Sequence, residues 1–207
     1  MLSVYDLKSR FQDLLRPIVL RFASFGITAN QVTLGSLLLS VVGGVFIIWQ
    51  PQSSWPLFVF PLVLLARMAL NAIDGMLARE YDQKSALGAI LNEICDVLAD
   101  AVLYLPLALI TGISEVLIVI LVVMAGVSEM MGVVALEIGA KRQYQGPMGK
   151  SDRALWLSIV ALVLASGIQA ELWVNIVLGL MVFLLIVTIV NRAKGALKES
   201  ESAHYAK

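Results

Sequence analysis

Six apolar stretches, most of them close to the length of a membrane-crossing helix, dominate this sequence. They run over residues 31–49, 55–78, 86–110, 116–136, 154–167 and 172–191, of which the fifth is the shortest. A helix needs about 20 mostly apolar residues to cross the hydrocarbon core of a bilayer. Only 14% of the residues are charged, against about 25% in an average globular protein. The sequence therefore predicts an all-α integral membrane protein with six transmembrane helices.

The lysine and arginine residues gather on one side of this predicted bundle. They precede the first stretch, lie between the second and third and between the fourth and fifth, and follow the sixth. The other three loops contain none, and only Arg67 lies inside a stretch. Because basic loops face the cytoplasm, we expect both termini to be cytoplasmic.

The chain is predicted to be one membrane domain with an arm at one end and a tail at the other. Residues 1–24 alternate apolar and charged side chains at helical spacing, which is typical of an amphipathic helix in the membrane interface; a solvated arm is the alternative. Residues 30–193 form the predicted bundle, and we expect the polar tail, residues 194–207, to fray. We expect no nucleic-acid partner, although the formal net charge of zero carries no information on this point.

Polar side chains interrupt the second and third stretches at helical intervals. One face of the second stretch carries Arg67, Asn71, Asp74 and Ala78, which are separated by four, three and four residues. One face of the third carries Gly88, Asn92, Asp96 and Asp100, each four residues apart. Residues at such spacing are neighbours on a helix surface. A charge near the centre of a membrane span costs about 2.5–3.5 kcal/mol, so such charges usually mark function.

A short loop joins these two stretches and brings their polar faces together. Antiparallel packing predicts Asp74 opposite Glu93 and Asn71 opposite Asp96. Converging carboxylates repel each other in a medium of low dielectric unless a positive charge lies between them. Arg67 offers one such charge, and a divalent cation such as Mg²⁺ or Mn²⁺ would also bind the oxygens of a diphosphate. From spacing alone, an Arg–Asp network that only joins the two helices remains open.

The spacing of this polar cluster resembles that of a known family. The CDP-alcohol phosphotransferases carry the string Asp-x2-Asp-Gly-x2-Ala-Arg-x8-Gly-x3-Asp-x3-Asp across their second and third spans. The corresponding residues here, with every gap of the same length, are Asn71, Asp74, Gly75, Ala78, Arg79, Gly88, Asn92 and Asp96. Six of the eight match, and the first and third aspartates are replaced by asparagine. Within the family the chain looks like the YnbA-like bacterial branch, which implies an inner membrane and a site that faces the cytoplasm.

The resemblance implies an enzyme of phospholipid biosynthesis. It would move a phosphatidyl or similar group from a CDP-linked donor, such as CDP-diacylglycerol, to a small polar acceptor alcohol and release CMP. By similarity, Mg²⁺ or Mn²⁺ would be held by Asn71, Asp74, Asn92 and Asp96, with Asp96 also acting as the catalytic base. CDP would be bound by Asn30, Thr33, Asp74, Gly75, Ala78, Arg79 and Gly88. The resemblance also implies a homodimer in contact with membrane lipids.

Three departures from the family pattern limit this interpretation. Each asparagine in place of an aspartate removes one negative charge, so metal affinity should fall or only one ion should bind. Asp100 and Glu93 are candidates to compensate, although Glu93 is turned about 100° from Asn92 on its helix. A catalytically weakened CDP-lipid-binding relative or scaffold therefore remains open. Asn30 and Thr33 also lack the proline that precedes them in the family, and Asn30 or Thr28 could instead cap the helix.

Further polar residues lie in the fourth stretch and in the basic loop after it. In this loop Lys150 and Arg153 are the favoured candidates to clamp a phosphate on the acceptor or on a lipid headgroup; a pure topology signal is the alternative. Glu129 lies deep in the fourth stretch, where it would line the acceptor pocket or pair with Arg67. Arg67, Asp100 and Glu129 are thus supporting residues. An ion or solute transporter is less favoured because no inverted halves or paired broken helices are present.

Overall fold

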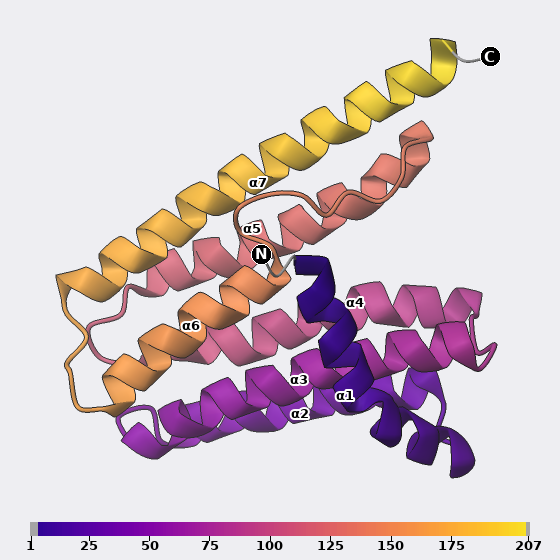
Figure 1. Ribbon diagram of the computed structural model, residues 1–207. Coiled ribbons are helices and arrows are strands. Elements are labelled where there is room, and N and C mark those ends of the chain that lie inside the picture. Colours follow the sequence, from indigo (N-terminus) through magenta and orange to yellow (C-terminus); the bar gives the residue numbers. More distant parts are fainter. Residues whose placement is uncertain (1–3, 206–207) are drawn as a thin grey trace.

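The computed structural model describes residues 4–205, with the side chains of residues 11–202, as helices and short connections (Figure 1). In chain order these are α1 (Val4–Ser24), α2 (Ala29–Trp49), α3 (Ser54–Glu80), α4 (Ala86–Tyr104), the 3₁₀ helix η1 (Leu105–Leu109), α5 (Glu115–Val134), the 3₁₀ helix η2 (Ala135–Ile138), α6 (Lys150–Ala165) and α7 (Leu172–Tyr205). The all-α prediction is confirmed for this part of the chain.

Four segments within the described residues are long and apolar enough to cross a membrane. They are Ala29–Trp49, Ser54–Glu80, Glu115–Ile138 and Leu172–Ser202. The chain is therefore an integral membrane protein. The two other predicted spans differ from these four because α4 carries three acidic residues among its 19 and α6 has only 16 residues.

Consecutive helices of the bundle run antiparallel, and segments distant in sequence lie side by side (Figure 1). The most extensive packing joins α2 with α3 and α4, α5 with α7, and α3 with α6. At Gly44 of α2 an added Cβ would overlap the carbonyl oxygen of Val102 in α4. A small residue at this point lets the two backbones approach, as is usual between membrane helices.

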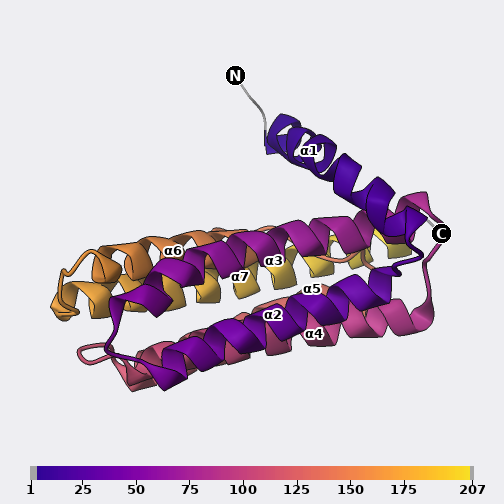
Figure 2. The same cartoon turned by 90° about the horizontal axis from the view of Figure 1, so that it is seen from below.

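The first helix, α1, leaves the bundle at an angle (Figure 2). One of its faces packs on α3, where Leu15 and Val19 are buried with Leu77. Its other face carries apolar side chains that remain exposed, among them Leu14 and Leu20. The placement of this segment in the membrane interface stays a prediction.

The start of α2 settles which residue caps that helix. The Thr28 hydroxyl accepts a hydrogen bond from the Gln31 N–H at 3.3 Å, and Gln31 Oε1 accepts one from the Thr28 N–H at 2.9 Å. This reciprocal pair is a capping box. Thr28 is therefore the cap, and the side chain of Asn30 is left for another role.

The prediction that the tail frays is wrong for the described residues. The helix α7 continues without a break from Leu172 to Tyr205, and Ala196 is fully buried against Ala135 and Ala140. The tail is rich in Ala, Lys and Glu, which have high helix propensity. Figure 1 shows this extension of α7 running beside the end of α5.

Candidate active site

The motif residues line a cavity of about 450 Å³ between α2, α3 and α4, which we call the α2–α4 cavity. Its wall includes all of the residues predicted to bind CDP, namely Asn30, Thr33, Asp74, Gly75, Ala78, Arg79 and Gly88. Asn92 and Glu93 also line it, so Asp74 and Glu93 face the same space from two helices. The structure thus gathers the predicted set in one place.

The two motif glycines leave room for neighbouring polar side chains. A Cβ at Gly88 would lie 2.8 Å from Asn30 Oδ1, and one at Gly75 would lie 3.1 Å from Arg79 Nη1. Gly88 therefore allows α2 and α4 to meet at the cavity, while the exposed Arg79 side chain lies back over Gly75.

Asp74 is a buried carboxylate without an ionic partner. Its side chain is only 5% exposed, and Oδ2 accepts a hydrogen bond from Thr33 Oγ1 at 2.7 Å. No ion pair reaches Asp74 from any of the described residues. Because a buried charge is unfavourable unless it is paired or coordinates a metal, this position suits a bound cation.

The predicted juxtaposition of Asn71 and Asp96 is confirmed. Asn71 Nδ2 donates a hydrogen bond to Asp96 Oδ1 at 3.0 Å, and Asn71 Oδ1 accepts one from Ser36 Oγ at 3.0 Å. The ammonium group of Lys150, at the start of α6, forms an ion pair with Asp96 Oδ1. The Asp96 carboxylate is therefore fixed from two sides and is still 21% exposed.

A second cavity, of about 520 Å³, lies on the other side of α4, and we call it the α4–α7 cavity. Its polar wall consists of Asn71, Asn92, Asp96, Glu129, Arg142, Tyr144, Lys150, Ser151, Asp152 and Arg192. Asn92 lines both cavities. Asp74 thus faces one cavity and Asp96 the other, with Asn92 between the two spaces.

A buried ion-pair network lies one helical turn beyond Asp96. Asp100 is held between two arginines, with Arg67 Nη2 2.6 Å from its Oδ1 and Arg153 Nη2 2.8 Å from its Oδ2. Arg67 Nη2 also donates to the backbone oxygen of Asp96 at 3.2 Å. Asp100 is consequently engaged and does not compensate for the missing aspartates, and the fully buried Arg153 lines neither cavity.

Of the two roles predicted for Glu129, the pairing with Arg67 is wrong, and the lining of an acceptor pocket stays a prediction. Glu129 lines the α4–α7 cavity, but it does not pair with Arg67. Its carboxylate lies 3.1 Å from Arg153 Nη2, 3.6 Å from Arg192 Nη1 and 3.9 Å from Arg142 Nη2. Glu129 therefore gathers three arginines from α6, α7 and the loop before α6.

Arg142 and Arg192 line the site although the sequence did not single them out. Arg142 forms an ion pair with Glu93, and the buried Arg192 donates to the backbone oxygen of Ser128. In sequence both resemble basic residues that only mark the cytoplasmic side. The sequence offered one indication of them: Glu129 is an acidic residue inside a predicted span, where a charge usually pairs with a nearby cation.

The residues predicted to bind a metal supply few negative charges. Their donors are two carboxylates, Asp74 and Asp96, and two amides, Asn71 and Asn92. No group of three or more His, Cys, Asp and Glu side chains in the described residues is arranged to hold a metal, so the amide oxygens would be needed. Oxygen donors of this kind fit Mg²⁺ or Mn²⁺, and the unpaired Asp74 would contribute most of the attraction.

The comparison with protein families decides the identity of this motif. The family model described as CDP-alcohol phosphatidyltransferase matches residues 26–191, which includes the whole α2–α4 cavity. This chain belongs to the CDP-alcohol phosphatidyltransferase family. The resemblance inferred from the motif is thereby confirmed, and the chain is a membrane phosphotransferase of phospholipid synthesis.

Two curated relatives support membership of the CDP-alcohol phosphatidyltransferases. The inner membrane protein YnbA of Escherichia coli (strain K12) is 39% identical over 196 residues, which cover 95% of this chain and 97% of the relative. The phosphatidylinositol phosphate synthase of Mycolicibacterium smegmatis is 29% identical over 97 residues, which cover 47% of this chain and 42% of that protein.

Solved structures of the phosphatidylinositol phosphate synthase PgsA1 of Mycobacterium tuberculosis share the fold of this CDP-alcohol phosphatidyltransferase. The structure with CDP-DAG bound gives a TM-score of 0.71 at 20% identity and covers 87% of this chain and 92% of that one. The complex with manganese and citrate gives 0.72 at 20% identity, over 87% and 88%.

Proposed function

We propose that this family member transfers a phosphatidyl group from CDP-diacylglycerol to an acceptor alcohol and releases CMP. The observation that carries the proposal is the pair of adjoining polar cavities, with Asp74 on one, Asp96 on the other and Asn92 on both. The donor nucleotide would occupy the α2–α4 cavity and the acceptor the α4–α7 cavity. A protein of the same fold has been solved with CDP-DAG bound.

The α2–α4 cavity suits a nucleoside diphosphate for two reasons. Gly75, Ala78 and Gly88 present backbone and little side chain, so a flat and polar ligand can approach closely. The exposed guanidinium of Arg79 supplies charge-assisted hydrogen bonds to phosphate, and Asn30 and Thr33 add polar groups on the α2 side.

One Mg²⁺ or Mn²⁺ would be held by Asp74 and Asp96, with the amide oxygens of Asn71 and Asn92 as further donors. When bound, the cation supplies neutralisation of the diphosphate and polarisation of the reacting phosphorus. A divalent metal agrees with the manganese complex of the related fold.

Asp96 acts as the base, because its partly exposed carboxylate lies on the wall of the α4–α7 cavity. It takes the proton of the acceptor hydroxyl, and the acceptor oxygen forms a bond to the lipid-side phosphorus. The bond from that phosphorus to the oxygen shared with CMP breaks, and CMP leaves with the electron pair. Asn71 and Lys150 hold the Asp96 carboxylate in position throughout.

The acceptor is held by the basic wall of the α4–α7 cavity. Arg142 reaches it from the loop, Lys150 from the start of α6 and Arg192 from α7. Arg153 supports this wall from behind through its contact with Glu129. These groups suit a small acceptor with several hydroxyl groups or a phosphate.

The proposal also covers how the protein lies in the membrane. All six helices of the bundle cross it, including α4 and α6, because the charges of α4 are paired or face the cavities. Both termini and both cavities are cytoplasmic, α1 lies in the interface, and the protein forms a homodimer among the lipids of a bacterial inner membrane. The name of the YnbA relative supports this location.

Release of CMP tests the proposal directly. Purified protein would be given CDP-diacylglycerol, Mg²⁺ or Mn²⁺ and a panel of polyols, phosphorylated polyols and serine. Asp96→Asn should lower the rate by about 10²–10⁴-fold, while Asp82→Asn, the same change on the exposed α3–α4 loop, should leave it unchanged. Metal-dependent release that survives in Asp96→Asn would rule out Asp96 as the base.

A second candidate is a CDP-lipid-binding protein with weakened turnover, favoured by Asn71 and Asn92. In that case CDP-diacylglycerol would bind without CMP release for any acceptor. Replacing both asparagines with aspartate would then start turnover, because two charges are returned to the metal site. Release by the native protein at a rate that the double replacement does not increase would exclude this candidate.

A further inference from the structure

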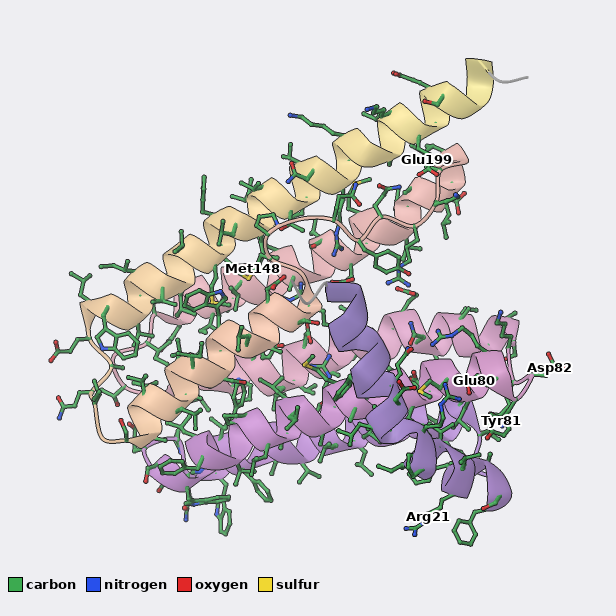
Figure 3. All side chains as sticks on the ribbon, viewed as in Figure 1. Arg21, Glu80, Tyr81, Asp82, Met148 and Glu199 are labelled. Atoms are coloured by element: carbon green, nitrogen blue, oxygen red, sulfur yellow. The ribbon has the colours of Figure 1, made fainter. Side chains whose placement is uncertain are left out.

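The loop of residues 139–149, between η2 and α6, is fastened to both of its neighbouring helices. Gln143, at its centre, is only 8% exposed. Its backbone N–H donates to the Gly132 oxygen on α5 at 3.2 Å, and its Nε2 donates to Glu199 Oε2 on the extension of α7 at 3.0 Å. Figure 3 places Glu199 between the ends of α7 and α5.

A glycine on α5 and a glycine on α7 allow the loop to pack closely against both helices at Gln143. A Cβ at Gly132 would lie 2.7 Å from the backbone oxygen of Gln143, and one at Gly195 would lie 2.6 Å from Gln143 Oε1. The same Oε1 accepts a hydrogen bond from Gln145 Nε2 at 2.6 Å. The side chain of Gln143 is therefore held tightly, and neither glycine position has room for a side chain.

Two further contacts tie the ends of the segment to α7. The Met148 N–H donates to Thr188 Oγ1 at 2.9 Å, and the Met148 side chain is fully buried. Ser200 Oγ donates to the Ile138 oxygen at 2.7 Å, just before the loop. The loop is thus fixed at its beginning, middle and end by one helix.

These anchors flank the two basic residues that reach the α4–α7 cavity from this segment. Arg142 directly precedes Gln143, and Lys150 follows Met148 by two residues. None of the anchor residues lines the α2–α4 cavity, and neither Gln143 nor Glu199 lines the α4–α7 cavity. Their influence on the site therefore passes through neighbouring residues that line this cavity, of which Arg142 and Lys150 carry charge.

We propose that Gln143 and Glu199 are positioning residues that set the affinity for the acceptor. The inference rests on the proposed function, because it takes the α4–α7 cavity as the acceptor site. When the hydrogen bond between them is lost, the loop moves more freely and the two basic side chains leave their productive positions. The acceptor is then bound more weakly, while donor binding in the other cavity is unaffected.

Kinetics of Glu199→Ala test this division. We expect the KM for the acceptor to rise about tenfold, the loss typical of one charge-assisted hydrogen bond, with the KM for CDP-diacylglycerol unchanged. Glu199→Gln keeps an oxygen that accepts from Gln143 and should stay within about twofold of the native protein. Glu201→Ala, at an exposed position two residues further along α7, is the matched control.

Gly132→Ala provides an independent variant on α5. Its Cβ meets the loop backbone, so the same selective rise in the acceptor KM is expected. Gly126→Ala, whose Cβ would meet only Val97 Cγ1 at 3.6 Å, should behave like the native protein. Native-like acceptor KM in both Glu199→Ala and Gly132→Ala, or an equal rise in both KM values, would overturn the proposal.

Amide hydrogen exchange separates this inference from the proposed function. Glu199→Ala should speed exchange in residues 139–149 and leave the α3–α4 hairpin unchanged. If the native protein releases no CMP with any acceptor, the proposed function fails and the exchange result alone decides whether the loop is anchored through Glu199. Unchanged exchange in the loop would overturn the anchoring.

Discussion

The two cavities of this protein are built in different ways. The α2–α4 cavity takes most of its wall from one helical hairpin, α3 and α4, whose residues are placed by three- and four-residue spacing. The α4–α7 cavity takes its wall from four further segments that are joined by ion pairs between residues distant in sequence, such as Arg142 with Glu93. The first can be inferred from a motif, whereas the second requires the tertiary structure.

Their charges differ as well. In the α2–α4 cavity, Asp74 has no ionic partner among the described residues. In the α4–α7 cavity, Arg142, Lys150 and Arg192 each lie beside a carboxylate. Asp74 therefore remains available to a bound cation, while the basic residues of the second cavity are already paired within the protein.

The largest effect is expected at Asp100, a buried carboxylate of α4 that forms ion pairs with Arg67 of α3 and Arg153 of α6. Asp100→Asn keeps the shape of the side chain but leaves Arg67 and Arg153 without the carboxylate between them. Breaking a buried ion pair costs about 3–5 kcal/mol, and about 2–4 °C of apparent Tm corresponds to each kcal/mol at this size. Thermal unfolding in detergent should therefore show a fall of about 6–20 °C.

The control for this change is Glu115→Gln, which removes a charge from an exposed position at the start of α5. It should leave the apparent Tm within about 2 °C of the native protein, because exposed charges contribute little. If Asp100→Asn were as stable as Glu115→Gln, the ion-pair network would not stabilise the packing of α4 with α3 and α6.

A smaller effect is expected from Gly44→Ala, which acts only where α2 packs on α4. The added Cβ overlaps the backbone oxygen of Val102, and overpacking of this kind costs about 1–3 kcal/mol. Thermal unfolding checks it against Gly35→Ala on the same helix, whose Cβ would meet nothing within 4 Å. Equal stability of the two variants would contradict the close approach of α2 and α4.

Arg79→Ala should have the smallest effect on the fold and separates the cavities by function. We expect the KM for CDP-diacylglycerol to rise about 10- to 100-fold, because a charge-assisted hydrogen bond contributes about 1.5–3 kcal/mol. The KM for the acceptor should not change. A rise in the acceptor KM alone would reverse the assignment of the two cavities.

Much of the α2–α4 region could be predicted from the sequence. Apolar stretches located the helices, and the motif spacing named residues from Asn30 to Gly88 that the structure places around this cavity. Helical spacing also predicted that Asn71 faces Asp96 on the wall of the other cavity, which the 3.0 Å hydrogen bond confirms. Such inferences succeed because they depend on the geometry of a single helix and of a short loop. The family match confirms the resemblance on which the roles of these residues were based.

The α4–α7 region was less predictable for a physical reason. Which arginines pair with Glu129 depends on the rotation of α6 and α7 about their axes, and only the packing of the whole bundle fixes that rotation. The helical tail was missed because its polar composition resembles that of a frayed end. Contacts with residues distant in sequence stabilise it there, among them the packing of Ala196 on Ala135 and the hydrogen bond from Ser200 Oγ to the Ile138 oxygen.

The most direct test of the account is a crystal structure with Mn²⁺ and CDP-diacylglycerol, with the ion located by its anomalous scattering. The account predicts one manganese peak within coordination distance of Asp74 and Asp96, with the cytidine among Asn30, Gly75 and Gly88. A peak remote from Asp74, or a cytidine beside Arg142 and Lys150, would contradict it.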